Sequence, residues 1–300
     1  MSGPQPPTFA ATVVLLREGP TGACESLVMR RHQASSFMGG ATVFPGGKLD
    51  PADFDAPAQG RSDRECANLL GIDDLQLARA AFVSGLRELD EEALVLLART
   101  ADGRWPTADQ LTEIHSELRS LHRGHRLEAA DHHRVLTAAG LTLALDLLVP
   151  FARWLTPAAE PVRFDAWFFA ALLPKGQHAQ TDGHESTEVQ WLTPADAMAS
   201  HACNGPILLP PPTWHTLARL GGLGTRPQDV LRQLGDGGVG PRYEPFRIAE
   251  SGQGPAVLLP SDPQHPQAEA WREAVRVHRE RHEPDVQRFV WRDGRMQPQG

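Results

Sequence analysis

Residues 87–92 read Arg-Glu-Leu-Asp-Glu-Glu, a stretch that combines four acidic side chains with one arginine. If this stretch is helical, Glu88, Glu91 and Glu92 stand at positions i, i+3 and i+4, so their carboxylates share one helical face. Apolar side chains occupy the opposite face, namely Val83, Leu86 and Ala93. The pattern therefore predicts a helix that packs on the core and holds three carboxylates over a cleft.

These three carboxylates repel one another, at a cost of roughly 0.2–0.5 kcal/mol per pair at helical spacing. Arg87 can pair with Glu91 at i+4, but one guanidinium group does not neutralise three carboxylates. Carboxylate oxygens are the ligands that Mg²⁺ and Mn²⁺ prefer, so Glu88, Glu91 and Glu92 are candidate metal ligands. The alternative is a solvated helix face that binds nothing.

Two glycines lie upstream, in the sequence Phe-Pro-Gly-Gly at residues 44–47. They follow the β-prone residues 41–43, so the chain is expected to leave a strand and enter a glycine loop. Because glycine has no side chain, the backbone at Gly46 and Gly47 can approach a ligand closely. The pairing of this loop with the acidic helix favours a binding site over a solvated face.

Together these residues resemble the signature of the Nudix hydrolases, G-x5-E-x7-R-E-U-x-E-E-x-G-U, in which U is a bulky aliphatic residue. Gly47 opens the pattern, and residues 87–92 with Val95 match its second half. Asp53 stands where the signature has glutamate. The signature arginine would fall at residue 61, whereas the matching run begins at residue 87, so 26 extra residues interrupt the pattern.

Leu94 stands where the signature has glycine. A glycine there lets the helix end in the left-handed conformation, in which leucine costs about 1 kcal/mol. The sequence therefore predicts that the helix exit is rebuilt.

The interrupted signature resembles a Nudix subgroup similar to the peroxisomal coenzyme A diphosphatases of animals. Further matches to this subgroup lie at residues 37–47, 153–157, 163–169, 185–191 with 193–194, and 208–213. The resemblance implies an α/β fold, a Nudix α/β/α sandwich with a mixed central sheet, a helical insertion and a C-terminal extension.

The domain organisation that follows has three parts. We expect a disordered leader at residues 1–7, a Nudix domain at 8–220 and a C-terminal extension at 221–300. Within the domain, residues 51–72 are expected to form a surface insertion in the signature, and residues 107–139 a helical lid or dimer-forming insertion.

The resemblance implies hydrolysis of a diphosphate linkage by cations that Glu88, Glu91 and Glu92 hold. Arg87 would orient Glu91 or the loop, and Gly46 and Gly47 would bring backbone to the phosphates. The general base is left open among Glu92 and two glutamates outside the signature, Glu185 and Glu188. Arg153 and Trp154 are candidate substrate contacts, because arginine binds phosphate and tryptophan can stack on a nucleobase.

The substrate is expected to be a nucleoside diphosphate derivative. The insertion-bearing relatives indicate coenzyme A or acyl-CoA, although Ser36 stands where coenzyme A hydrolases of the uninterrupted subgroup carry arginine. ADP-ribose, NADH and nucleotide sugars are alternatives, as is a Nudix-like binding or regulatory module without turnover.

Composition sets further limits. The net charge of −8 argues against binding to nucleic acid or a membrane surface. Three cysteines without a C-x-x-C pair fit a reducing compartment, and no secretory leader is present, so we expect a cytoplasmic protein. Five histidines lie within residues 107–139, at 115, 122, 125, 132 and 133. Their spacing suggests no carboxylate partners, which favours solvated helices over a metal site.

Overall fold

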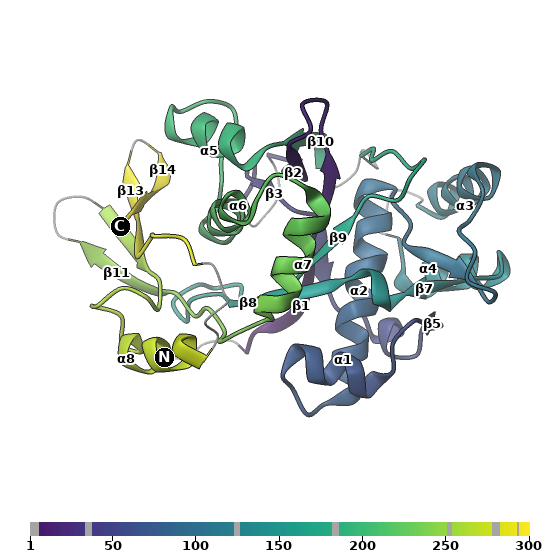
Figure 1. Cartoon of the computed structure of the whole chain (residues 1–300), viewed down its shortest axis with the longest axis horizontal. Coiled ribbons are helices and arrows are strands. Elements are labelled where there is room, and N and C mark those ends of the chain that lie inside the picture. The colour runs from purple at the N-terminus through teal and green to yellow at the C-terminus, as the bar shows by residue number, and fades with distance from the viewer. Residues whose placement is uncertain are drawn as a thin grey trace.

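The computed structural model describes residues 6–33, 38–122, 127–181, 186–250, 254–277, 283–292 and 294–300. Three residues singled out above, Ser36, His125 and Glu185, lie outside these ranges, as do residues 1–5 of the expected leader. Figure 1 shows a central sheet with helices on both sides and a smaller sheet near the C-terminus. The predicted α/β architecture with a mixed central sheet is confirmed.

The central sheet has the strand order β10-β2-β1-β9-β8, with β3 paired to β2 and β4 paired to β1. Its strands are β1 (Thr8–Glu18), β2 (Cys24–Arg31), β3 (Thr42–Val43), β4 (Gly46–Lys48), β8 (Val149–Leu155), β9 (Phe164–Leu172) and β10 (Ser186–Leu192). β1 and β2 form the antiparallel hairpin that their β-prone sequences favour, whereas β1 and β9 run parallel. The glycine strand β4 pairs with β1, the central strand of this order, and so lies near the middle of the sheet.

Alternation along β9 gives the sheet two buried faces. Trp167 and Phe169 point into the core that contains α2 (Leu75–Ala93), and Phe168 and Ala170 point into a second core on the other face. The helices on that second face are α5 (Pro194–Ala202), α6 (Pro211–Leu223) and α7 (Pro227–Gly237). Burial on both faces explains why the sequence of β9 reads as a nearly continuous apolar run.

The helix α2 contains the acidic stretch, as its spacing predicts. Asp74 caps its start by accepting a hydrogen bond from the Leu77 N–H at 3.0 Å. Glu88, Asp90 and Glu92 are buried along with the apolar residues. The helix is therefore covered on almost every side, more completely than an amphipathic surface helix would be.

The prediction of a rebuilt helix exit is wrong. Leu94 itself adopts the left-handed conformation, with φ 53° and ψ 37°, and its N–H donates to the Asp90 carbonyl at 3.0 Å. Neighbouring contacts hold the exit in place: the Gln180 N–H donates to the Ala93 carbonyl at 3.0 Å, and the Gln177 amide bonds both backbone groups of Leu96. These tertiary contacts offset the strain of a leucine at this position.

This strain can be measured by comparing Leu94→Gly with Leu94→Ala. Both variants lose the leucine side chain, but only glycine adopts the left-handed conformation without a Cβ penalty. We expect the Gly variant to be the more stable by about 1 kcal/mol in urea unfolding. Equal stabilities would show that Leu94 is not strained.

The insertion in the signature is more than a surface loop. It contains η1 (Pro51–Phe54), β5 (Ala58–Gln59) and α1 (Asp63–Leu70). Cys66, Ala67 and Leu70 of α1 belong to the same core as α2, and Asp53 of η1 is fully buried. The apolar face of α1 thus packs against α2. The sequence of the insertion does not reveal this contact, because the segment is polar and contains Pro and Gly.

The second insertion forms α3 (Ala108–Leu121) and α4 (Ala129–Ala138). Ile114 and Leu118 of α3, with Val135 and Leu136 of α4, join the core around α2. A three-stranded sheet, β5-β7-β6, lies beside them, with β6 at Ala98–Thr100 and β7 at Leu141–Ala144. The turn η2 (Leu145–Leu147) then leads into β8. Both insertions therefore pack against the acidic helix.

The C-terminal residues form a four-stranded sheet and one more helix. These elements are β11 (Phe246–Glu250), β12 (Gly254–Leu258), α8 (Ala268–Val277), β13 (Arg288–Arg292) and β14 (Arg295–Gln299). Tyr243 attaches them to β8 by two backbone hydrogen bonds, of 2.8 Å from its N–H to Arg153 and 2.7 Å from Leu155 to its carbonyl. Among the described helices, none has both the length and the hydropathy that crossing a bilayer requires.

Candidate active site

The glycine strand β4 lies directly against the acidic helix. The Gly46 N–H donates to Glu92 Oε2 at 2.9 Å. A side chain at Gly46 would collide with the Ala11 carbonyl of β1, and one at Gly47 would collide with the carboxylate of Glu88. The approach of backbone requires glycine at position 46, and glycine at 47 leaves room for the Glu88 carboxylate. Gly46 and Gly47 lie in strand β4 and not in the predicted loop, but the structure does bring them against the acidic helix.

Arg87 binds several of the groups around this contact. Its guanidinium, 1% exposed, donates to both oxygens of Asp53, from Nε at 2.8 Å and from Nη2 at 2.9 Å. Nη1 donates to Glu88 at 2.8 Å and to Glu91 at 3.2 Å, which includes the predicted i,i+4 pair. Nη2 also donates to the Lys48 carbonyl at 3.1 Å. Arg87 therefore fixes the signature aspartate, two acidic side chains and the end of β4 in one arrangement.

The donor set suits a hard divalent cation by its chemistry. Asp53, Glu88, Glu91 and Glu92 carry four negative charges when ionised, against the single positive charge of Arg87. Glu88 and Glu91 both accept from the same guanidinium nitrogen, so a cation bound there would share these carboxylates with Arg87. Within the described ranges, no three acidic, histidine or cysteine side chains are already arranged to hold a metal. The residues fit the cation, but their side chains must adjust to bind it.

The carboxyl of Asp53 is held in its ionised form by its neighbours. Burial would raise its pKa, but hydrogen bonds from Arg87 and His133 outweigh burial and lower the pKa to about 2 from its usual 3.8. Asp53 is therefore ionised throughout the neutral range, as a partner for a buried guanidinium must be.

This lowered pKa predicts a loss of stability in acid. Because the folded-state pKa lies below the unfolded one, ionised Asp53 stabilises the fold above pH 4, and that contribution disappears as the pH falls through about 2. Its size is about 2 kcal/mol. A carbon-13 NMR titration of the Asp53 carboxyl should give a midpoint near 2. A midpoint at the usual aspartate value would contradict the proposed ion pair.

Three histidines of the second insertion are buried against carboxylates, so the expectation of solvated histidines is wrong. His133 Nε2 lies 3.1 Å from Asp53 Oδ1. His115 and His132 lie 2.8 and 2.9 Å from the two oxygens of Asp90. The partners sit on η1 and α2, far away in sequence, so the spacing of the histidines along the chain could not show them.

The environments of these imidazoles differ. Burial would raise the pKa of Asp90, but its hydrogen bonds to His115 and His132 hold that pKa well below its ordinary value. For His132 burial prevails and lowers the pKa, whereas for His115 burial is outweighed by Asp90 and the pKa rises. Asp90 and its two histidines attach α3 and α4 to the buried side of α2.

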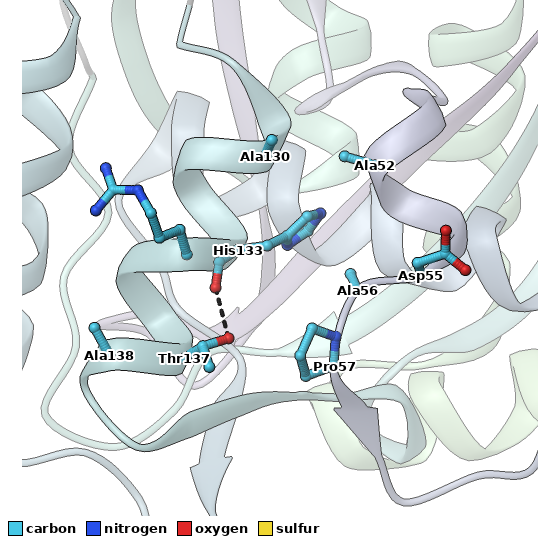
Figure 2. Close-up of a pocket in the computed structure, with 9 residues that line it drawn as sticks. Ala52, Asp55, Ala56, Pro57, Ala130, His133, Thr137 and Ala138 are labelled. Atoms are coloured by element: carbon cyan, nitrogen blue, oxygen red, sulfur yellow. Dashed lines mark hydrogen bonds between the residues drawn. The ribbon is translucent and has the colours of Figure 1, made fainter.

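A shallow depression lies where α4 meets η1 (Figure 2). His133 projects from α4 toward η1 beside Ala52 and Ala56, with Asp55 at the rim. The Thr137 hydroxyl donates to the His133 carbonyl at 2.8 Å. His133 is thus at the boundary between this depression and the buried Asp53.

The expected substrate contacts on β8 are engaged elsewhere. Arg153 forms a bidentate ion pair with Asp165, at 2.7 and 3.0 Å, and its guanidinium lies 4.5 Å from the centre of the Trp167 ring. Trp154 is 4% exposed and stacks on Tyr243 at 4.3 Å within the second core, on the opposite sheet face from α2. Contrary to expectation, its indole offers no exposed face to a nucleobase, because residues of the C-terminal extension cover it.

Glu188 lies on the edge strand β10, opposite Arg30 of β2, and accepts a hydrogen bond from Gln190 at 2.6 Å. Its side chain is exposed. The structure describes no contact between Glu188 and the acidic helix, and Glu185 lies outside the described residues. The identity of the general base stays a prediction.

Comparison with known proteins gives a consistent set of relatives. No family model matches the chain. Acyl-coenzyme A diphosphatase NUDT19 of Gallus gallus is 29% identical over 238 residues, which cover 67% of this chain and 62% of the relative. The protein of the same name from Homo sapiens is 28% identical over 234 residues, covering 68% and 62%. The chain thus spans less than two thirds of these relatives' length.

A solved structure extends the comparison. The NUDIX hydrolase from Alicyclobacillus acidocaldarius superimposes with a TM-score of 0.53 at 28% identity. The match covers 73% of this chain and 92% of that one. The likeness therefore includes almost the whole of the solved protein.

Proposed function

Since this chain belongs to the Nudix hydrolase superfamily, we propose that it hydrolyses the diphosphate linkage of a nucleoside diphosphate derivative, with coenzyme A or acyl-CoA as the substrate class. The observation that carries the proposal is the acidic end of α2 beside Gly46 and Gly47. We further propose Mg²⁺ or Mn²⁺ as the cation and the cytoplasm as the location.

The roles of the residues follow from their contacts. Glu88, Glu91 and Glu92 would hold the cation, which when bound neutralises phosphate oxygens and makes water a better nucleophile. Arg87 keeps Glu88 and Glu91 together, since one of its nitrogens donates to both. Gly47, which lies against Glu88, leaves room for the carboxylate beside the backbone. Glu92, Glu185 and Glu188 are the candidates to take the proton of the attacking water.

Coenzyme A is favoured over other diphosphates by the names of the relatives, acyl-coenzyme A diphosphatase in chicken and human. The interrupted signature supports the same class. Ser36, in place of an arginine found in the uninterrupted subgroup, means that any recognition of coenzyme A here would use other residues. ADP-ribose, NADH and nucleotide sugars share the diphosphate and are the competing substrates.

The test is hydrolysis by the purified full chain with Mn²⁺. The substrates are coenzyme A, an acyl-CoA, ADP-ribose, NADH and UDP-glucose, with products identified by mass spectrometry. We expect adenosine 3′,5′-bisphosphate and the phosphopantetheine fragment from coenzyme A or its thioester. Cleavage of ADP-ribose alone would overturn the substrate class, and cleavage of none, despite bound Mn²⁺, would favour a non-catalytic binding module.

A further inference from the structure

A chain of hydrogen bonds runs from the second insertion to the acidic helix. His133 Nε2 of α4 donates to Asp53 Oδ1 at 3.1 Å, because an ionised carboxylate can only accept. The same oxygen accepts from Arg87 Nε at 2.8 Å. Nη1 of Arg87 then donates to Glu88 and Glu91. Three successive contacts therefore connect α4 to two of the three proposed metal ligands.

This series of hydrogen bonds is shielded from water for most of its length. Asp53 is fully buried, Arg87 is 1% exposed and His133 is 7% exposed. Water therefore does not readily replace a lost donor at Asp53. Without His133 the carboxylate would shift toward its remaining donors, which are Arg87 and the Asp50 N–H that donates to Oδ2 at 2.8 Å. Because Asp53 accepts from both Nε and Nη2 of Arg87, a rotation of Asp53 moves the guanidinium as well. Glu88 and Glu91 would follow, since both accept from Nη1.

The neighbouring histidine provides a natural contrast. His132 is on the same helix, is fully buried and also contacts a carboxylate, that of Asp90, at 2.9 Å. Asp90 is bonded to His132 and His115, whereas Arg87 is bonded to Asp53. Loss of either histidine removes a buried charge-assisted hydrogen bond, but only the loss of His133 interrupts the connection to Glu88 and Glu91.

We propose that His133 is a positioning residue for the cation site, acting through Asp53 and Arg87 to hold Glu88 and Glu91 in place. The proposal rests on the proposed function, in that these glutamates bind the cation. It makes the second insertion a part of the active site and not only a covering element.

The test measures Mn²⁺ binding by the full chain, by calorimetry or by the electron paramagnetic resonance of free Mn²⁺, beside kcat and KM. His133→Gln is the conservative variant, because its amide nitrogen can reach the place of Nε2, whereas the shorter side chain of His133→Asn cannot. The matched control is His132→Asn. If His133→Asn does not fold, His133→Leu is used in its place, because leucine is closer to histidine in volume.

We expect His133→Asn to weaken Mn²⁺ binding and to lower kcat by about tenfold each, with KM little changed. This is the lower end of the loss expected for a direct partner of a metal ligand, because His133 acts through Asp53 and Arg87. His133→Gln should recover to within about threefold of the wild type. His132→Asn should lower Tm while leaving the Mn²⁺ dissociation constant unchanged.

Several outcomes would overturn the proposal. One is wild-type Mn²⁺ affinity in His133→Asn, and another is equal weakening by the two Asn variants, which would mean a general loss of structure. Failure of the proposed function is separate: a wild type that binds Mn²⁺ without hydrolysing any substrate refutes the activity, while the effect on Mn²⁺ affinity still decides the role of His133. A wild type that binds no Mn²⁺ refutes both.

Discussion

Glu91→Gln and Glu92→Gln are each expected to lower kcat of the Mn²⁺-dependent hydrolysis by about a thousandfold, which is about 4 kcal/mol of transition-state stabilisation. The amide has the size of the carboxylate but lacks the charge that attracts a divalent cation. In Glu92→Gln the amide oxygen can still accept from the Gly46 N–H, so the contact between β4 and the helix survives. The measurement is steady-state kinetics with saturating Mn²⁺, with Tm recorded for each variant.

The control for this pair is Glu113→Gln on α3, an exposed glutamate on the helical insertion. It carries the same chemical change away from the acidic face and should retain wild-type kcat. Undiminished turnover in both Glu91→Gln and Glu92→Gln would be incompatible with the proposed site. Loss of turnover together with loss of the folded state would instead assign these residues to structure.

Asp53→Asn should lower the free energy of unfolding by about 3–5 kcal/mol, the usual cost of leaving a buried charge without its partner. Arg87 is buried too completely for water to replace the carboxylate, and the hydrogen bonds from Arg87 to Glu88 and Glu91 come from Nη1. The asparagine can still accept one hydrogen bond, but it cannot balance the guanidinium charge at Nε and Nη2. Urea unfolding measured by circular dichroism gives the difference.

Asp55→Asn is the matched control, because this aspartate lies two residues away and is exposed at the rim of the depression. Its unfolding free energy should change by less than about 0.5 kcal/mol. An Asp53→Asn variant as stable as Asp55→Asn would show that the Asp53–Arg87 ion pair does not hold the fold together.

The sequence by itself determined that the acidic residues 87–92 are helical, that a short strand precedes Gly46 and Gly47, and that the chain resembles the Nudix signature. These features depend on short-range patterns: i, i+3 and i+4 spacing for the carboxylates, β-prone runs for the strands and the Gly-Gly pair before a helix. Such patterns are set by residues within one or two turns of each other, so they can be recognised along the chain.

The tertiary structure decided how the site is supported. Asp53 meets Arg87 across 34 positions, and His133 meets Asp53 across 80. Leu94 keeps its left-handed conformation because Gln177 and Gln180 hold the segments beside it. Trp154 is enclosed by Tyr243 from the C-terminal extension. In each case the partner comes from a distant segment, and only packing of the whole chain brings the two together. Burial removes the water that would otherwise satisfy the charges and polar groups, so these must find partners within the protein.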